Sequence, residues 1–193
     1  MYSQLLKLDT GYLDVYLIYQ PYGDIHGSWR AKEELYETGK IKSLGVSNFH
    51  PDRVMDLMVN NKVKPVINQI ETHVFYQREK YNKFLKENYI VHESWAPYAE
   101  GKNDFFTNEV LAQIGEKYGK SVAQVVLRWM IQRDVVVIPK SVTKSRIIEN
   151  FNVFDFELTL EDMETIKTLD TKQSLFFSHR VPKIIKWFST MIQ

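Results

Sequence analysis

Residues 135–150 read VVVIPKSVTKSRIIEN, and this stretch decides the class of fold. VVVIP (135–139) is a short, nearly continuous apolar run, which is typical of a parallel strand that is covered on both faces. A helical segment begins soon after it, and Thr143 stands where its N-cap is expected. A strand that passes into a helix through a short polar turn is part of a βα unit, so the stretch predicts an α/β protein.

Four other runs of β-branched and aromatic residues precede this one: VYLIY (15–19), IKSLGV (41–46), PVINQI (65–70) and YIVHESW (89–95). Helices are expected at 28–40, after His50-Pro51-Asp52, at 77–88, at 107–118, at 121–133 and after Thr159. Residues 3–9 look like the end of an earlier helix. Strands that alternate with helices predict a parallel sheet.

The helix signals give sharper expectations. In 28–40 the residues Trp29, Leu35 and Tyr36 are expected to face inward. Thr107 and Ser121 are the expected N-caps of the helices at 107–118 and 121–133, and Thr159 begins a Thr-x-x-acid capping box. The inward face of 121–133 is predicted to consist of Val122, Val125, Val126, Trp129 and Met130.

Two architectures fit this pattern. A doubly wound open sheet accommodates five strands, whereas a (β/α)8 barrel needs roughly 250 residues, so this chain supplies only part of one. An open dinucleotide-binding sheet carries a glycine-rich turn after its first strand, and QPYGD (20–24) is not such a turn. Polar positions instead end successive strands: Gln20, Ser47-Asn48, Gln69, Trp95 and Lys140-Ser141. This favours one domain over 1–193 built as a partial barrel, because barrels assemble their sites from many strand ends.

Composition narrows the range of functions. The net charge of +1 argues against a nucleic-acid partner or an anionic membrane. The absence of cysteine excludes disulfides and thiol catalysis. With no bilayer-length apolar run and no signal peptide in residues 1–20, a cytoplasmic protein is the simplest expectation. The five histidines show no metal-ligand spacing, so no metal is expected, and His73 and His92 are expected to be structural or to line a pocket.

The turn after 135–139 carries a candidate binding site. Polar side chains gather there, directly after the strand and on roughly one face of the helix: Lys140, Ser141, Arg146, Glu149 and Asn150. Cations and hydroxyls around a helix amino terminus make an anion site. A solvated basic helix start explains the same spacing equally well, so spacing alone leaves both interpretations open.

Several motifs, taken in order, resemble the aldo-keto reductase family, and most of all its bacterial diketogluconate reductase-like branch. They are GKIKSLGVSNF (39–49), Gln69 in PVINQIE, SWAPYAEGK (94–102) and IPKSVTKSRIIENF (138–151). LDTGYLDVYLIYQPYGD (8–24) and SLFFSHR (174–180) are also similar, so the resemblance covers essentially the whole chain. It implies a barrel segment from the helix before the fourth strand to the eighth strand and the tail. It also implies an NADPH-dependent enzyme that reduces small carbonyl substrates.

Carried over position by position, the resemblance implies a set of NADPH contacts. The nicotinamide carboxamide would meet Ser47, Asn48 and Gln69, and the nicotinamide ring would stack on Trp95. The 2′-phosphate and adenine end would lie on Lys140, Ser141, Val142, Thr143, Arg146, Glu149 and Asn150. Structural alternatives remain for each strand-end residue: a turn and N-cap for Ser47-Asn48, a satisfied sheet amide for Gln69, and a core position for Trp95.

The catalytic residues of the family are not matched. Its proton-donating tyrosine, with the lysine and aspartate that tune it, belongs to the second and third strands of the barrel. Its histidine belongs in a pattern L-I-H-x-P, where this chain reads LIYQP and has Tyr19. A phenol is a poor acid at neutral pH without help, so a catalytic Tyr19 is not expected. The chain is expected to be a truncated, inactive reductase or, alternatively, a non-catalytic binding or interaction module.

Two further expectations concern the open strand edges and the carboxy-terminal tail. Open strand edges are expected to make it weakly stable or prone to self-association. In the tail, an aromatic wall of the substrate pocket is suggested by Phe176, Phe177, His179 and Trp187. A terminal helix packed on the barrel is equally compatible with Ile184, Ile185, Trp187 and Phe188.

Overall fold

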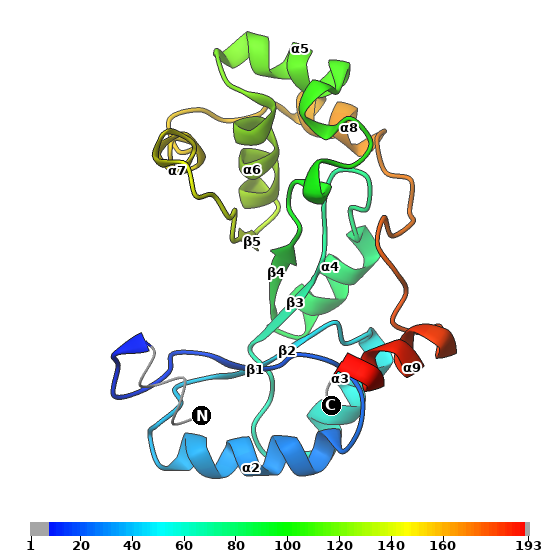
Figure 1. Ribbon diagram of the computed structural model, residues 1–193. Helices are drawn as coiled ribbons and strands as arrows, with labels where there is room; N and C mark the ends of the chain where they lie inside the picture. The colour runs from blue at the N-terminus through cyan, green and yellow to red at the C-terminus, as the bar shows by residue number, and fades with distance from the viewer. Residues whose placement is uncertain (1–7, 192–193) are drawn as a thin grey trace. The chain divides into compact units, whose positions relative to one another are not determined.

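The computed structural model describes residues 8–191, so most of the helix end predicted at 3–9 lies outside the described residues. The chain alternates strand and helix, and all five predicted strands are present (Figure 1). The first strand pairs with the second, the second with the third, and the fourth with the fifth, and these pairs are all parallel. The predicted α/β class is therefore confirmed, whereas the partial barrel stays a prediction.

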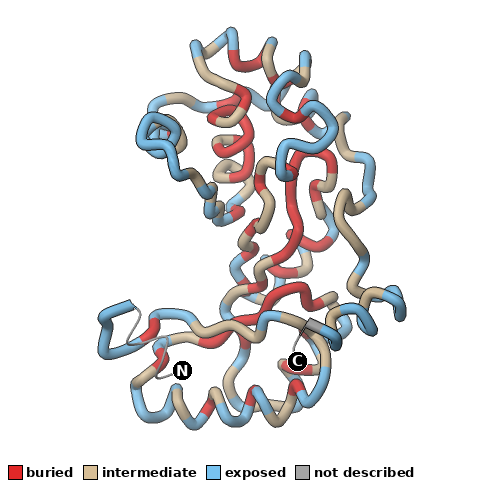
Figure 2. The backbone as a smooth tube through the Cα atoms, viewed as in Figure 1, coloured by how far each residue is buried: buried red, intermediate tan, exposed pale blue. Residues whose placement is uncertain are grey.

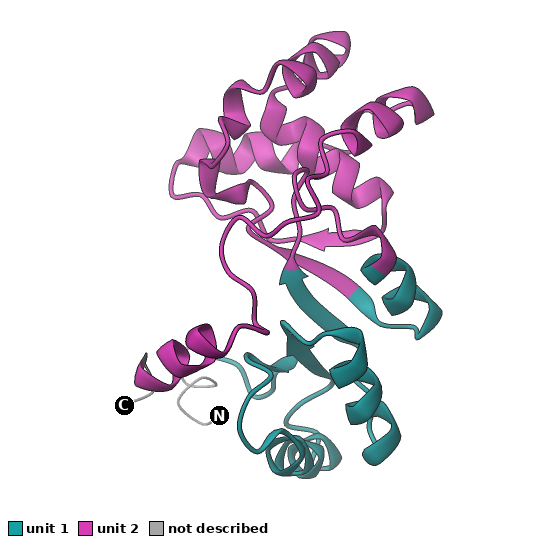
Figure 3. Ribbon diagram, turned by 90° about the vertical axis from the view of Figure 1, so that its right-hand side faces the viewer, with its two compact units in different colours: residues 1–70, 81–91 teal, residues 71–80, 92–193 magenta. Residues whose placement is uncertain are grey.

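Two compact units make up the chain (Figure 3). Unit 1 contains residues 1–70 and 81–91, and unit 2 contains residues 71–80 and 92–193. Each unit has its own hydrophobic core. The expectation of a single domain over 1–193 stays a prediction, and the two units are described separately below.

Strands β1 (Tyr16–Ile18), β2 (Leu44–Ser47) and β3 (Ile67–Glu71) pair side by side in chain order. They belong to unit 1, except for Glu71, the last residue of β3, which belongs to unit 2. Helices α2 (Ile25–Glu37), α3 (Pro51–Asn60) and α4 (Glu79–Glu87) bury their apolar faces in the core of this unit. Gly45 allows the strands to approach, because a Cβ there would lie 2.5 Å from a methyl of Leu17 and 2.4 Å from one of Ile67.

Unit 2 contains strands β4 (Val91–Trp95) and β5 (Val135–Val137), which pair in parallel. Its helices are α5 (Glu109–Tyr118), α6 (Val122–Gln132), α7 (Lys144–Phe151), α8 (Leu160–Lys167) and α9 (Pro182–Met191). Two 3₁₀ turns, Ala99–Gly101 and Phe105–Thr107, follow β4. Helix α6 supplies much of the core, and its buried positions stand out in Figure 2.

The structure confirms the predicted starts of two helices and the predicted inward face of one of them. A capping box at Ser121 begins α6, and one at Thr159 begins α8. The five residues predicted to face inward from α6 are all buried: Val122, Val125, Val126, Trp129 and Met130. Capping and helical periodicity were local signals, which explains why they could be interpreted without the tertiary structure.

Two predictions about helices were wrong in detail. Helix α2 begins three residues early, and Tyr36 is 40% exposed while Glu33 is buried. Glu33 can be buried because its carboxylate accepts a hydrogen bond from the backbone N–H of Val63 at 2.7 Å. The N-cap of α5 is Asn108 and not Thr107, because the side chain of Asn108 accepts from the N–H of Leu111 at 3.1 Å.

Within residues 8–191, no helix combines the length and the apolar character needed to cross a bilayer. The same described residues bring no three His, Asp or Glu side chains together as metal ligands do.

Candidate functional site

The turn from β5 into α7 forms one side of a cavity in unit 2. The cavity has a volume of about 330 Å³. It is lined by Tyr98, Phe106, Ser121, Val122, Ala123, Lys140, Ser141, Arg146, Glu149 and Asn150. The structure thus brings together five of the residues that the sequence assigned to the 2′-phosphate and adenine end. Lys140 and Ser141 lie in the six-residue connection (138–143) between β5 and α7, and Arg146, Glu149 and Asn150 lie on α7 itself.

The two cations of this cavity are not neutralised by the protein. The side chains of Lys140 and Arg146 are exposed, and neither forms an ion pair with a carboxylate within residues 8–191. Both lie close to the amino terminus of α7, where backbone N–H groups add partial positive charge. This part of the cavity is therefore suited to an anion.

The other two residues predicted in this turn play smaller parts. Thr143 is the N-cap residue of α7, as predicted, but its side chain makes no capping hydrogen bond. The Oγ of Ser141 instead accepts a hydrogen bond from the backbone N–H of Thr143 at 3.2 Å. Val142 is 91% exposed and does not line the cavity. Ser141 therefore shapes the turn in addition to facing the cavity.

Two other residues that line the cavity, Tyr98 and Ser121, hold Glu149 and Asn150 in place. The hydroxyl of Tyr98 donates to Oδ1 of Asn150 at 2.8 Å, and the hydroxyl of Ser121 donates to Glu149. Burial, together with the charge of Glu149, raises the pKa of Tyr98. Tyr98 therefore remains a neutral donor in this site. Glu149 and Asn150 keep further acceptor and donor capacity for a polar base.

An apolar depression of about 810 Å³ shares Lys140, Ser141 and Asn150 with this cavity. The residues that give it its apolar character include Ile147, Ile148, Phe151 and Phe154, and each of these is more than half exposed. The spacing of these residues is that of an ordinary helix face, so it did not predict this depression. Much of the apolar side of α7 is exposed.

In unit 1, Ser47, Asn48 and Gln69 lie together where β2 and β3 end. The hydroxyl of Ser47 is fully buried and donates to the backbone carbonyl of Gln69 at 2.9 Å. Asn48 has a left-handed backbone, with φ of 63°, and its Nδ2 donates to the carbonyl of Tyr19 at 3.3 Å. The side chain of Tyr19 itself is 70% exposed. Ser47 and Asn48 thus each donate to a main-chain carbonyl.

Trp95, at the end of β4, is not part of the buried core of unit 2. Its ring is half-buried and meets two rings of the carboxy-terminal tail. Phe176 lies 5.2 Å from it, ring centroid to centroid, in an edge-on arrangement, and Phe177 lies 6.5 Å away with an interplanar angle of 27°. Trp95 is therefore not one of the buried core residues, and its role as the ring on which the nicotinamide stacks stays a prediction.

The aromatic tail and the terminal helix are parts of one cluster. Phe177 contacts the rings of His179, Trp187 and Phe188, and the last two residues belong to α9. The aromatic residues of the tail thus lie together and residues 182–191 are helical, whereas a wall of the substrate pocket and packing on a barrel stay predictions. Burial lowers the pKa of His179 to about 4, so this imidazole is neutral at pH 7.

A buried carboxylate at the end of β3 was missed by sequence analysis. Glu71 accepts hydrogen bonds from Nε2 of His73, at 3.1 Å, and from two groups of the tail, the hydroxyl of Ser174 and the N–H of Leu175. His73 is fully buried, in keeping with the structural role predicted for it, and so is His92, whose Nε2 lies 2.7 Å from Oγ1 of Thr72. No local pattern could have joined Glu71 to a serine 103 positions away.

Residues 3–171 match the sequence model of the aldo/keto reductase family. The chain belongs to this family. Glyoxal reductase of Bacillus subtilis is 46% identical to this aldo/keto reductase chain over 169 residues, which are 87% of this chain and 60% of that protein. Methylglyoxal reductase DkgA of Escherichia coli is 40% identical over 176 residues, which are 90% of this chain and 64% of that protein.

Solved aldo-keto reductases have the same fold over most of this chain. An enzyme from a Medee basin deep-sea metagenome library superimposes with a TM-score of 0.88 at 39% identity, covering 93% of this chain and 67% of its own. A Bombyx mori aldo-keto reductase in complex with NADP gives a TM-score of 0.82 at 30% identity, covering 89% and 62%. The aldo/keto reductase chain thus spans about three fifths of the length of the curated relatives it matches.

Proposed function

We propose that this chain binds NADPH, with the 2′-phosphate and adenine of the cofactor in the cavity beside α7. The observation that carries this proposal is the pair of unneutralised cations, Lys140 and Arg146, on one cavity at a helix amino terminus. A phosphate ester there gains charge-assisted hydrogen bonds from a guanidinium and attraction from an ammonium group. Ser141 adds a hydroxyl, and the exposed turn at Val142 and Thr143 borders the phosphate.

The adenine end is proposed for Glu149 and Asn150. An adenine amino group is a donor and its ring nitrogens are acceptors, which matches a carboxylate beside an amide. Ser121 and Tyr98 hold these two side chains by hydrogen bonds, so less side-chain entropy is lost when a ligand binds. The 330 Å³ of the cavity suits this end of a dinucleotide and not the whole molecule.

The nicotinamide end is proposed from the family resemblance. Trp95 offers a flat ring on which a nicotinamide stacks. In unit 1, the hydroxyl of Ser47 and the amides of Asn48 and Gln69 are proposed to meet the carboxamide. When bound, NADPH supplies a hydride, and these side chains hold and orient the ring that carries it.

In a protein with the complete catalytic set of the family, we propose that this cofactor site serves the reduction of small carbonyl compounds. Two of the similar proteins are named glyoxal reductase and methylglyoxal reductase, so a small 2-oxoaldehyde is the substrate class we favour. For the printed sequence we propose binding without turnover, since Tyr19 stands in the place of the family's histidine. We also propose a partial (β/α)8 barrel, a cytoplasmic location and self-association through open strand edges.

Fluorescence titration with NADPH and with NADH tests the proposal. We expect saturable binding of NADPH and at least about tenfold weaker binding of NADH, because NADH lacks the phosphate that Lys140 and Arg146 would bind. Equal affinity for both nucleotides would contradict the assignment of the phosphate site, and no saturable binding of either would contradict the function itself. Incubation with methylglyoxal and NADPH separates binding from turnover, and we expect no NADPH consumption above background.

A further inference from the structure

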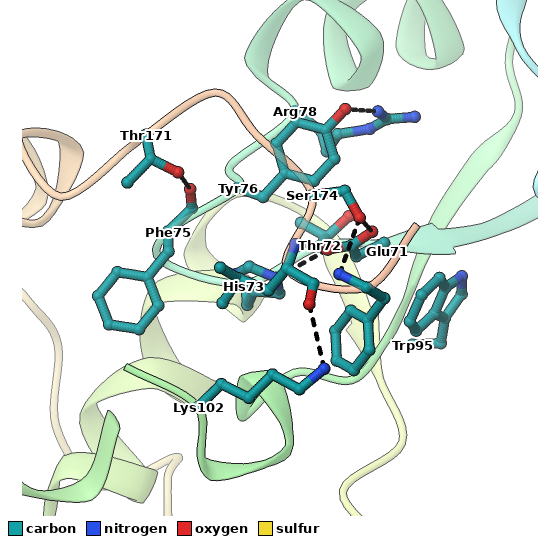
Figure 4. Close-up of polar contacts among 12 residues, drawn as sticks. Glu71, Thr72, His73, Phe75, Tyr76, Arg78, Trp95, Lys102, Thr171 and Ser174 are labelled. Carbon is teal, nitrogen blue, oxygen red and sulfur yellow. Dashed lines mark hydrogen bonds and ion pairs between the residues drawn. The ribbon is translucent and has the colours of Figure 1, made fainter. Parts of the chain in front are cut away.

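The carboxylate of Glu71 ties the carboxy-terminal tail to the end of β3. The side chain is 6% exposed and receives three hydrogen bonds (Figure 4). Its Oε2 accepts from the hydroxyl of Ser174 at 2.6 Å. Its Oε1 accepts from the backbone N–H of Leu175 at 3.0 Å and from Nε2 of His73 at 3.1 Å. Two of its three donors therefore come from the tail.

Burial of this carboxylate costs free energy, and no ion pair with a lysine or arginine side chain of the described residues offsets that cost. Among the described residues, no lysine or arginine pairs with Glu71, and its one ion-pair partner is the imidazole of His73. The other ring nitrogen of His73, Nδ1, is buried and has no hydrogen-bond partner there. Apolar residues would fill such a position at lower cost if packing were its purpose. The buried carboxylate is better explained by a role in holding the tail in a fixed position.

The tail is anchored at two separate points. Upstream, the N–H and the hydroxyl of Thr171 both donate to the carbonyl of Phe75, at 2.9 Å and 2.8 Å. Downstream, Glu71 holds Ser174 and Leu175, and Nζ of Lys102 donates to the carbonyl of Leu175 at 3.1 Å. The second anchor fixes the backbone immediately before the two phenylalanines that meet Trp95.

Those two rings set the environment of Trp95. Phe176 is held between the Trp95 ring and Nζ of Lys102, which lies 3.7 Å from the centre of the Phe176 ring. Phe176 also meets the ring of His73, at 6.3 Å between centroids. Release of Ser174 and Leu175 from Glu71 would free the backbone on which Phe176 and Phe177 depend.

We propose that Glu71 is a positioning residue for the nicotinamide end of the cofactor site. Its carboxylate latches residues 174–177 against Trp95 and thereby fixes the orientation and the apolar cover of that ring. The proposal rests on the proposed function, because it takes Trp95 as the ring on which the nicotinamide stacks. The residues that form the latch are Glu71, His73, Ser174 and Leu175.

Ser174→Ala is the test variant, because it removes one donor to Glu71 and leaves the carboxylate in place. The same hydroxyl accepts from the N–H of Phe176 at 3.1 Å and donates to the carbonyl of Phe177 at 3.2 Å, so the test reads Leu175, whose N–H is bonded to Glu71 and not to Ser174. Ser178→Ala is its matched control, since Ser178 lies in the same tail and its Oγ accepts only from the N–H of Arg180 in the contacts described. Glu71→Gln is the stronger variant, and Ser174→Ala keeps the test valid if Glu71→Gln does not fold.

The first measurement is amide hydrogen exchange and chymotrypsin cleavage after Phe176 and Phe177. We expect Ser174→Ala to raise exchange at Leu175, whose N–H is bonded to Glu71, roughly tenfold, the usual effect of losing one hydrogen bond to a charged acceptor. Exchange at Thr171 should not change, because its anchor is independent. Equal exchange in the Ser174→Ala and Ser178→Ala proteins would overturn the latch.

The second measurement compares NADPH with adenosine 2′,5′-bisphosphate, which reaches only the cavity beside α7. We expect Ser174→Ala and Glu71→Gln to weaken NADPH binding several-fold and to leave binding of the fragment unchanged. A purely structural defect would weaken both ligands, and tighter NADPH binding would mean that the tail competes with the nicotinamide. Either result overturns the positioning role. If the unmodified chain binds neither ligand, the proposed function fails, and the exchange data still decide whether the latch exists.

Discussion

Two groups of polar residues differ in their hydrogen-bond and ion-pair partners: those at the strand ends of unit 1, and those that follow β5 in unit 2. Ser47 and Asn48 are buried and hydrogen-bonded to carbonyls of their own unit. Lys140 and Arg146 are exposed and have no carboxylate partner within residues 8–191. The first group stabilises the fold whether or not a ligand is present, whereas the second group gains its main partner only from a ligand. Substitutions in the two groups should therefore affect different measurements.

The largest effect is expected for Asn48→Val. Asn48 has a left-handed backbone, which a β-branched residue tolerates poorly, and the change also removes the hydrogen bonds from Nδ2 to Tyr19 and Ser47. We expect the free energy of unfolding in urea to fall by about 3 kcal/mol. Asn48→Gly, which keeps the backbone conformation, should lose only about 1 kcal/mol. Equal losses in the two variants would show that backbone strain plays no part.

Arg146→Ala should show the opposite behaviour. NADPH affinity should fall roughly tenfold to a hundredfold, because a charge-assisted bond to the phosphate is lost, while stability changes by less than about 0.5 kcal/mol. Lys144→Ala is the matched control, since Lys144 carries the same charge at the start of α7 but does not line the cavity. If Lys144→Ala weakens NADPH equally, net charge and not a placed contact governs binding.

A smaller effect is expected for Ser47→Ala. The hydroxyl donates to the carbonyl of Gln69, which also accepts from the N–H of Asn48, so that acceptor remains satisfied. We expect a loss of about 1 kcal/mol of stability, measured by urea unfolding. Ser145→Ala, in the exposed part of α7, should cost less than about 0.5 kcal/mol. A loss as small for Ser47→Ala would remove the contrast between the two regions.

The tail should also respond to acid. Burial lowers the pKa of His179 to about 4, with a further lowering by Arg78 and an opposing effect of Glu71. In a released tail the pKa is near 6.5. Between about pH 6.5 and pH 4 the released tail binds more protons, so the docked tail loses stability as the pH falls through that window. NMR signals of the Phe177 and His179 rings should report this release, and His179→Gln should abolish its pH dependence.

The acid response of Asp162 provides an internal reference for that experiment. Burial opposes ionisation of Asp162, but hydrogen bonds from Lys117, Tyr118 and Thr159 outweigh it and lower the pKa to about 2. Its contribution to stability is therefore retained until the pH falls below about 3.8 and is lost toward pH 2. Release of the tail should precede loss of this cluster, and simultaneous loss of both would contradict the assignment to His179.

Local signals in the sequence predicted most of the elements. The apolar runs gave the five strands, and the capping boxes at Ser121 and Thr159 gave the starts of two helices. Errors arose where a tertiary contact overrode a local preference. Glu33 is inside because it meets the N–H of Val63, 30 residues away, which no pattern within α2 indicates.

The same limit applies to the candidate site. Spacing placed Arg146, Glu149 and Asn150 on one face of α7, and these residues do line one cavity. The hydrogen bonds that hold that face come from Tyr98 and Ser121, which the spacing could not identify. The carboxylate of Glu71 was missed for a similar reason, because an acidic residue at a strand end has no distinctive local pattern.

One hydroxyl, that of Ser121, serves two neighbours at once. As the N-cap of α6 it accepts from the N–H of Gln124, so its lone pair is engaged and its hydrogen is directed at Glu149. Positions 121 and 149 are therefore coupled: a change at Ser121 alters both the start of α6 and a wall of the cavity, and a change at Glu149 removes the acceptor of the Ser121 hydroxyl. Their substitutions should show epistasis, with the double replacement costing less than the sum of the single ones.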